Sequence, residues 1–146
     1  MPIWIGSWGS EAGLRRVARL GDGWLASAYH ITPASFADAL ARLHQALHQV
    51  GREPERFPHA LGSMFYYVTE DRRLAEEILV EVLSPTLNHP VELLRERLPI
   101  GTPAQCAEKL RKLQAAGVRK IFLWPVEDEV SQLRRFHEQV LPQLPP

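Results

Sequence analysis

Short apolar segments alternate with amphipathic segments along the whole chain, and this alternation restricts the possible folds more than any other feature. The apolar segments occupy residues 2–6, 23–27, 60–69 and 119–126. Each is followed by a segment whose apolar residues recur at helical spacing. Strands that are apolar throughout and joined by helices are typical of parallel sheets. The sequence therefore predicts an α/β fold of four β-α units with parallel strands.

Helix boundaries are marked by capping residues. Ser10, Thr32 and Thr102 each precede a predicted helix, and Gln105 has the spacing that completes a capping box with Thr102. Pro85 and two later prolines should leave residues 84–101 irregular, apart from a short helix over 91–98. The last helix, over 128–144, is predicted to turn five apolar residues toward the core: Val130, Leu133, Phe136, Val140 and Leu141.

Length and charge indicate a single domain over residues 1–146 and argue against several classes of partner. The 17 basic and 17 acidic residues cancel, so no excess of positive charge favours nucleic acid. No apolar run approaches the roughly 18 residues of a membrane span. The N-terminus lacks a basic segment followed by an apolar one, which a signal peptide requires. We therefore expect a cytoplasmic protein with no nucleic-acid or membrane partner.

The cysteine and the histidines give no catalytic or metal-binding pattern. Cys106, the single cysteine, lies at helical spacing with Leu110 and Leu113 and is predicted to be a buried structural thiol. His44 and His48 are four residues apart on one helix, but no acidic residue between them completes a zinc-binding pattern. An exposed helix face explains them, and we expect no metal.

The segment Gly6-Ser7-Trp8-Gly9-Ser10 joins the first strand to the first helix. Glycine allows the backbone to approach a ligand, and the following helix directs unpaired N–H groups at an anion. This turn is therefore a candidate phosphate site. It lacks the Gly-Lys-Ser/Thr of a nucleotide-triphosphate loop and the spacing of the dinucleotide fingerprint. The alternative is that its glycines serve only the tight turn.

Three segments, in order, resemble the luciferase-like monooxygenases. The first is PIWIGSWGSEAGLRRVARLGDGWLAS, in which Gly21-Asp22-Gly23-Trp24 corresponds to the family's Ala-Asp-Gly-Trp. The second is GTPAQCAEKLRKLQAAGVRKIFL, which is similar to the family's Gly-Thr-Pro helix and the Ala-Gly-Val before its last strand. The third, LRRFHEQVLPQL, is similar to its C-terminal helix. The resemblance spans nearly the whole chain.

The resemblance implies half of a (β/α)8 TIM barrel, with this chain providing strands five to eight. It implies FMN or coenzyme F420 as the cofactor, without deciding between them, and a small organic substrate. In such relatives the turn after strand five contacts the cofactor's phosphate, which assigns Ser7, Trp8, Gly9 and Ser10 to cofactor binding. Trp8 stands where the family often has a small or polar residue.

A complete barrel needs about 250 residues, so the chain is expected to begin at strand five and to lack a first half. A lone half has open sheet edges and an uncovered apolar face, which favours association. We expect a homodimer or a complementary half-barrel. No catalytic residue is assigned. Polar and aromatic candidates follow the strands or lie within them: Trp24, Ser27, Tyr29, His30, Thr69, Glu70, Trp124 and Glu127. Packing in the core is the preferred interpretation of both Trp24 and Trp124.

Two functions follow. The first is a flavin- or deazaflavin-dependent oxidoreductase of the monooxygenase type, active only when a second half-barrel completes the fold. The alternative is a non-catalytic half-barrel that binds a phosphorylated ligand or serves as an assembly subunit. The glycine-serine turn favours the first function, and the absent first half favours the second.

Overall fold

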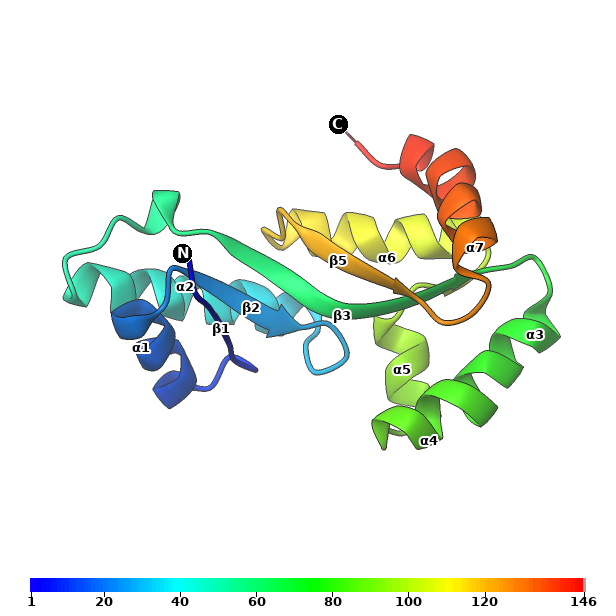
Figure 1. Cartoon of the computed structure of the whole chain (residues 1–146), viewed down its shortest axis with the longest axis horizontal. Helices are drawn as coiled ribbons and strands as arrows, with labels where there is room; N and C mark the ends of the chain where they lie inside the picture. Colours follow the sequence, from blue (N-terminus) through cyan, green and yellow to red (C-terminus); the bar gives the residue numbers. More distant parts are fainter. Residues whose placement is uncertain (146) are drawn as a thin grey trace. The chain divides into compact units, whose positions relative to one another are not determined.

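The computed structural model describes residues 1–145, and these residues form two compact units. Unit 1 contains residues 1–62 and 113–122, and unit 2 contains residues 63–112 and the chain from residue 123 onward. Both units are discontinuous in sequence, because the chain passes into unit 2 along β3, returns to unit 1 at the end of α6, and enters unit 2 again along β5 (Figure 1). Each unit is described separately.

All of the strands for which pairing registers are defined run parallel. The strands are β1 (Trp4–Gly6), β2 (Gly23–Ser27), β3 (His59–Val68), β4 (Ile100–Gly101) and β5 (Ile121–Pro125). The pairing order is β1-β2-β3-β4, and β5 also pairs with β3. In the parallel pairing of β1 with β2, Ile5 lies opposite Trp24. In the parallel pairing of β2 with β3, Trp24 lies opposite His59. The predicted parallel α/β architecture is confirmed, with the two-residue β4 as an addition.

The strand β5 runs in the same direction as β3. The Leu61 N–H donates to the Lys120 carbonyl oxygen at one end of the pair. The Val126 N–H donates to the Tyr66 carbonyl oxygen at the other end. Because the residue numbers rise together along both strands, the pairing is parallel.

Helices connect the strands at the expected places. The α-helices are α1 (Glu11–Leu20), α2 (Pro33–Gln49), α3 (Arg72–Glu77), α4 (Ser84–Leu87), α5 (Val91–Arg97), α6 (Pro103–Ala115) and α7 (Glu129–Arg135). Shorter 3₁₀ and π segments are η1 (Pro54–Arg56), η2 (Ile78–Leu83), η3 (Phe136–Val140) and η4 (Leu141–Gln143). The predicted caps Ser10, Thr32 and Thr102 all accept backbone hydrogen bonds.

In unit 1 an aromatic pair lies at the centre of the core. The rings of Trp24 and Phe36 stack with centroids 5.2 Å apart, and both residues are fully buried. The end of α1 is fixed from a distance: Arg52 donates to the carbonyl oxygens of Ala18 and Gly21 at 3.0 and 2.6 Å. A cation near the last carbonyls of a helix also offsets the negative end of its dipole. The α1 helix is therefore held at both termini.

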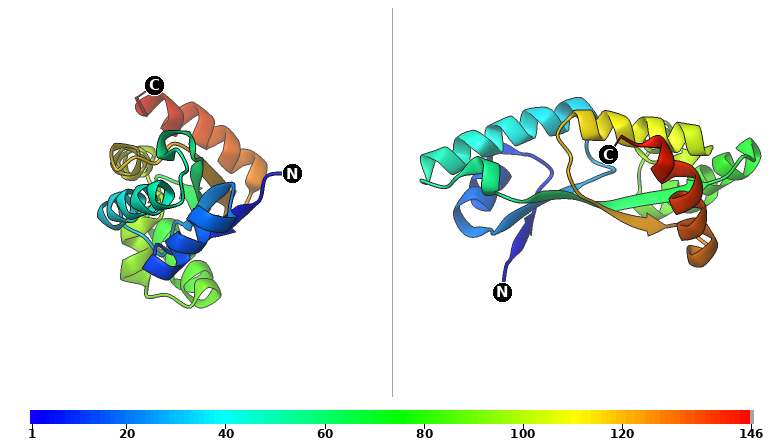
Figure 2. Two further views of the ribbon diagram at one scale, coloured as in Figure 1. Left: turned by 90° about the vertical axis from the view of Figure 1, so that its left-hand side faces the viewer. Right: turned by 90° about the horizontal axis from the view of Figure 1, so that it is seen from above.

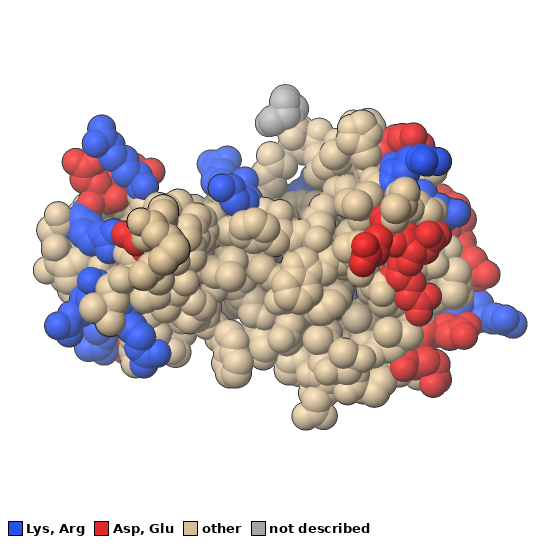
Figure 3. All heavy atoms as spheres, in the orientation of Figure 1, with Lys and Arg blue, Asp and Glu red and all other residues tan. Residues whose placement is uncertain are grey.

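In unit 2 the α6 helix lies along one side of β3 and β5 (Figure 2). Phe65 on β3 and Trp124 on β5 meet edge to face, with ring centroids 5.4 Å apart. Trp124 remains 48% exposed, so its predicted burial in the core is wrong. Figure 3 shows surface without charged side chains over β5, with acidic side chains beyond its C-terminal end. Phe122 and Trp124 on β5 are both 48% exposed, so this strand presents large apolar side chains at the surface.

The last helix turns a different face inward from the one predicted. Val130 and Leu133 are 72% and 52% exposed, and Leu141 is also exposed, whereas Phe136 and Val140 are buried as expected. Gln132 takes an inward position because its amide pairs with the backbone at the end of β3. Because Gln132 faces inward, Val130 and Leu133 on the same helix face outward, and the prediction, which considered apolar residues alone, was wrong for them.

Helical structure also continues through Pro85, where the sequence predicted an irregular segment. The η2 segment before it is a π-helix, and the Ser84 N–H donates to the Leu79 carbonyl five residues back. Proline interferes with the carbonyl four residues before it in a regular α-helix. The wider π turn leads into α4, which contains Pro85, so the chain stays helical to Leu87.

Candidate functional site

The Ser7–Ser10 turn lies at the carboxyl end of β1, in unit 1, and is anchored to β2. The Ser7 N–H donates to the Leu25 carbonyl oxygen at 3.1 Å. The indole Nε1 of Trp24 donates to the Ser7 carbonyl oxygen at 3.0 Å. Since Trp24 is fully buried, the core of unit 1 directly fixes the first residue of the turn.

Gly9 has a backbone conformation that residues with a side chain can adopt only with strain. Its φ is +89°, in the region that side chains rarely adopt. A Cβ atom there would lie 3.0 Å from the Cβ of Ala39 on α2. The Gly9 N–H donates to the Ser7 hydroxyl at 3.3 Å, so one amide of the turn is satisfied within the turn.

The first turn of α1 keeps two amides available. The Ser10 hydroxyl accepts from the Gly13 N–H at 3.2 Å, and the Leu14 N–H donates to the Ser10 carbonyl. Among the described residues, the amides of Glu11 and Ala12 have no such partner, and the first turn of a helix directs its free N–H groups outward along the axis. These amides and the serine hydroxyls can bind an oxyanion.

Gly13 is a site residue that the sequence reasoning did not identify. A Cβ on Gly13 would collide with the Ser7 hydroxyl and lie 2.9 Å from that of Ser10. The absent side chain therefore gives both hydroxyls their room beside α1. A glycine inside a helix costs about 1 kcal/mol of stability relative to alanine. A glycine in the first turn of a predicted helix is therefore a sequence signal that the position needs space.

Trp8 is the aromatic residue of the turn, and 70% of its surface is exposed. Its ring stacks on His30, with centroids 4.2 Å apart and planes 12° apart. The Nδ1 atom of His30 lies 2.9 Å from the Ser27 hydroxyl, and the centroid of the Tyr29 ring lies 4.4 Å from that of His30, with the two rings tilted. The structure thus brings together the candidates after β1 and β2.

In unit 2 the strand-end candidates are less concentrated. Thr69 is buried, and its hydroxyl accepts from the Asp71 N–H at 3.1 Å at the start of α3. Glu70 is exposed, and Glu127 is exposed beyond β5. Trp124 packs on Phe65 as described above. No hydrogen bond or ion pair joins the side chains of Thr69, Glu70 and Glu127 in the described part of unit 2.

Cys106 is fully buried in α6, as predicted. Burial raises the pKa of its thiol to about 12, although the nearby Lys109 ammonium opposes the shift. Because the thiolate is the reactive form of cysteine, this thiol is inert near neutral pH. Across residues 1–145 no group of three His, Cys, Asp or Glu side chains is arranged to hold a metal. None of the helices in the same residues is long and apolar enough to cross a membrane.

These features of the turn and sheet agree with what sequence comparison finds. The profile of the luciferase-like monooxygenases matches residues 1–89, which is more than half of the chain. The chain belongs to the luciferase-like monooxygenase family. No curated protein matches it.

Solved structures share the fold at low identity. An F420-dependent secondary alcohol dehydrogenase with an F420–acetone adduct has a TM-score of 0.80 at 17% identity, over 100% of this chain and 49% of that one. The F420-dependent tetrahydromethanopterin reductase of Methanopyrus kandleri has a TM-score of 0.68 at 14% identity, over 99% and 51%. An FMN-bound 3,6-diketocamphane monooxygenase component from Pseudomonas putida has a TM-score of 0.65 at 15% identity, over 97% and 48%.

The chain spans about half the length of these structures. With the parallel strands and alternating helices, this confirms the predicted fold class: half of a (β/α)8 barrel.

Proposed function

We propose that the chain acts as one half-barrel domain of a flavin- or deazaflavin-dependent oxidoreductase, with Ser7, Trp8, Gly9 and Ser10 on the phosphate side of the cofactor. Its family and the three similar structures support this class, because two are F420-dependent enzymes and the third holds FMN. The choice between FMN and F420 is left to experiment.

The observation that carries the proposal is the arrangement of the turn. It lies where a parallel strand ends, which is where barrel enzymes place their sites. Gly9 leaves the turn without a side chain at its closest approach to α2. The amides of Glu11 and Ala12 and the hydroxyl of Ser7 provide donors for an anion. The Glu11 carboxylate is ion-paired with Arg15, which reduces its repulsion of a phosphate.

In this function the residues of the chain bind and orient. When bound, the cofactor supplies the two-electron redox chemistry. The α1 amides fix its phosphate, and the exposed ring of Trp8 provides a flat apolar surface beside it. His30, stacked on Trp8 and hydrogen-bonded to Ser27, is the candidate proton donor at this strand edge.

A second half-barrel is part of the proposal, supplied by another copy or by a separate polypeptide. In unit 2, Trp124, Val130 and Leu133 expose large apolar surfaces. In unit 1, Ile3 is exposed beside the edge strand β1. Surfaces of this kind favour association. Light scattering on the purified chain should give more than the monomer mass of 16.6 kDa if copies pair. A monomer that gains activity only with an added half would identify a separate partner.

The test of cofactor binding is a titration with FMN and with F420, followed by fluorescence. We expect saturable binding of one of them to the unmodified chain. Gly9→Asp should abolish it, because the new carboxylate would repel the phosphate. Gly9→Asn has nearly the same shape without the charge and should bind better than Gly9→Asp. Gly51→Asp adds a carboxylate at another glycine of positive φ, +71°, and should bind normally.

A folded chain that binds neither cofactor, with any associated half present, would refute the proposal. Binding that Gly9→Asp leaves unchanged would refute the assignment of the turn. If the chain bound a simple phosphate monoester through this turn but neither cofactor, the non-catalytic alternative would replace the oxidoreductase function.

A further inference from the structure

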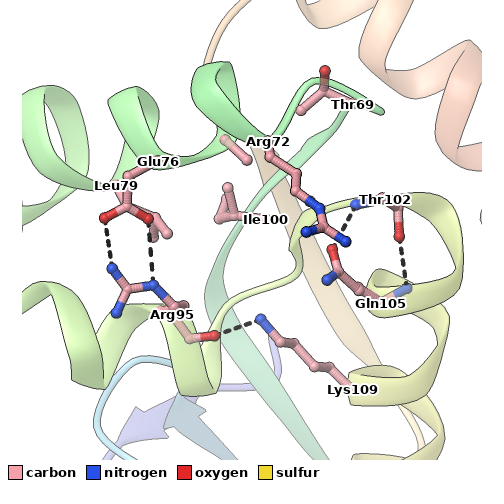
Figure 4. A pocket seen from close by; sticks show the side chains of 11 residues that line it. Thr69, Arg72, Glu76, Leu79, Arg95, Ile100, Thr102, Gln105 and Lys109 are labelled. Atoms are coloured by element: carbon pink, nitrogen blue, oxygen red, sulfur yellow. Dashed lines mark hydrogen bonds and ion pairs between the residues drawn. The ribbon is translucent and has the colours of Figure 1, made fainter.

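Unit 2 contains a polar cavity of about 470 Å³, formed by residues far from the Ser7–Ser10 turn in the sequence. Its walls come from α3, α5, β4 and α6 (Figure 4). Its volume is within the range of small-molecule sites, about 300–1,000 Å³. The charged residues that line it are Arg72, Glu76, Arg95 and Lys109. Three cations therefore face one carboxylate, which leaves two positive charges without an anionic partner in the cavity wall.

Only one of the three cations is neutralised. Arg95 and Glu76 form an ion pair at 2.6 Å, on one side of the cavity. Arg72 has no ion pair or hydrogen bond in the described residues, and Figure 4 shows its guanidinium directed toward Thr102 and Gln105. An unpaired guanidinium with five fixed donors is suited to binding an oxyanion.

Lys109 is held in place by the backbone and not by a carboxylate. Its Nζ atom donates to the carbonyl oxygens of Arg95 and Leu98 at 2.5 and 2.6 Å. An ammonium has three donors, so one stays available. Burial lowers the pKa of Lys109, and the nearby positive charge of Arg95 lowers it further. An anion in the cavity would offset both effects.

Two amides at the start of α6 are already satisfied by side chains of the same helix start. The Thr102 N–H donates to Gln105 Oε1 at 3.0 Å, and the Gln105 N–H donates to the Thr102 hydroxyl at 3.3 Å. The attraction for an anion therefore comes from Arg72 and Lys109. The rest of the wall combines the apolar side chains of Ala75, Leu79 and Ile100 with Thr69 and Gly101.

We propose that this cavity binds a small organic phosphate monoester, with its phosphate between Arg72 and Lys109 and its organic part on the apolar side chains of the wall. A phosphate monoester carries close to two negative charges at neutral pH, which matches the two uncompensated cations. A monocarboxylate matches only one of them. The site is independent of the proposed redox cofactor and of the turn that would bind it.

The experiment is a calorimetric titration of the full chain with n-butyl phosphate, inorganic phosphate and butanoate. We expect n-butyl phosphate to bind most tightly, because it alone combines the dianion with an apolar body. Arg72→Gln should weaken this binding about tenfold or more, as loss of a charged hydrogen-bonding partner does. Arg73→Gln is the matched control, since Arg73 is an exposed neighbour outside the cavity lining, and it should bind normally.

A second variant separates this cavity from the Ser7–Ser10 turn. In the Gly9→Asp chain, binding of n-butyl phosphate that depends on Arg72 should persist. The proposal fails if n-butyl phosphate shows no saturable binding up to about 10 mM, if Arg72→Gln binds like Arg73→Gln, or if Gly9→Asp removes the binding. It also fails if butanoate binds as tightly as n-butyl phosphate. Because Arg72 is exposed and unpaired, its replacement should leave the fold intact, which circular dichroism verifies.

Discussion

Each unit fixes the end of a strand with one buried side chain, but the two side chains work differently. In unit 1, Trp24 makes a single hydrogen bond to the Ser7 carbonyl and otherwise packs in the core against Phe36. In unit 2, Gln132 accepts from the Val68 N–H at 2.7 Å and donates to the Val68 carbonyl at 3.2 Å. Gln132 thus continues the strand pairing with its side-chain amide.

Trp24 and Gln132 thus represent two kinds of stabilisation: burial of apolar surface, and hydrogen bonding of buried polar groups. A large aromatic ring contributes mainly by the surface that it removes from water. A buried amide contributes little net stability, but its loss leaves backbone groups without partners, which is costly. The stability of the turn after β1 should therefore depend on the volume of the side chain at residue 24. The stability at the end of β3 should depend on the hydrogen-bonding groups of the side chain at residue 132.

The largest expected effect is that of Trp24→Ala. It removes a fully buried ring and the hydrogen bond that holds Ser7. We expect a loss of about 3–5 kcal/mol in the free energy of unfolding, measured by urea denaturation. Hydrogen exchange of the Ser7 amide should accelerate with it. Trp8→Ala is the control, because Trp8 is exposed and its ring stacks on His30 at the surface, and it should cost within about 1 kcal/mol. Equal losses in the two variants would contradict the assigned roles.

Gln132→Leu should cost about 2–3 kcal/mol, although it makes the core more apolar. The Val68 N–H would lose its acceptor, whereas the carbonyl would retain a contact with Arg135 at 3.5 Å. The measurement is the hydrogen-exchange rate of the Val68 amide, which should rise in Gln132→Leu. Gln139→Leu, at an exposed position of the chain, is the control. A neutral or stabilising Gln132→Leu would show that packing, and not hydrogen bonding, determines the end of β3.

These two residues also show how far sequence reasoning extends. Strand and helix order, the caps and the parallel sheet could be predicted, because each depends on residues close together in the chain. Gln132 could not be assigned to the core, because its partner lies 64 residues away. The Ser7–Ser10 turn is contiguous, so the sequence alone could suggest it as a candidate site, whereas the Arg72 cavity is assembled from four segments and only the structure shows it. Nothing in the local pattern marks Arg72 as unpaired.

Gly9→Ala tests the conformation of the turn itself. An L-residue at φ +89° is strained, and its Cβ would crowd Ala39. We expect a loss of about 1–2 kcal/mol in the free energy of unfolding. Gly51→Ala has positive φ and open space around the new Cβ, so it should cost only about 1 kcal/mol. Thermal unfolding of both variants measures the part that is due to crowding. A smaller loss at Gly9 than at Gly51 would contradict the close approach to α2.

The smallest effect, with the opposite sign, is expected at Tyr66. Its hydroxyl is buried without a hydrogen-bond partner in the described residues. Tyr66→Phe should leave stability unchanged or raise it by up to about 1 kcal/mol. Burial raises the pKa of Tyr66 above 10.0, so the unfolded chain loses this proton first. Stability should therefore fall as the pH rises through and above 10, and Tyr66→Phe should lack this contribution. A clear destabilisation would indicate a partner for the hydroxyl.

The discontinuity of both units has a consequence for biosynthesis. Residues 113–122 complete unit 1, yet at ~10 residues per second they leave the ribosome's active centre about 5–6 s after Gly62. During that interval the edge of β3 that will receive Lys120 has no strand beside it. Nascent chains with unpaired edges are substrates for chaperones and prone to aggregate. Residues 1–62 should therefore be made well before unit 1 can finish folding.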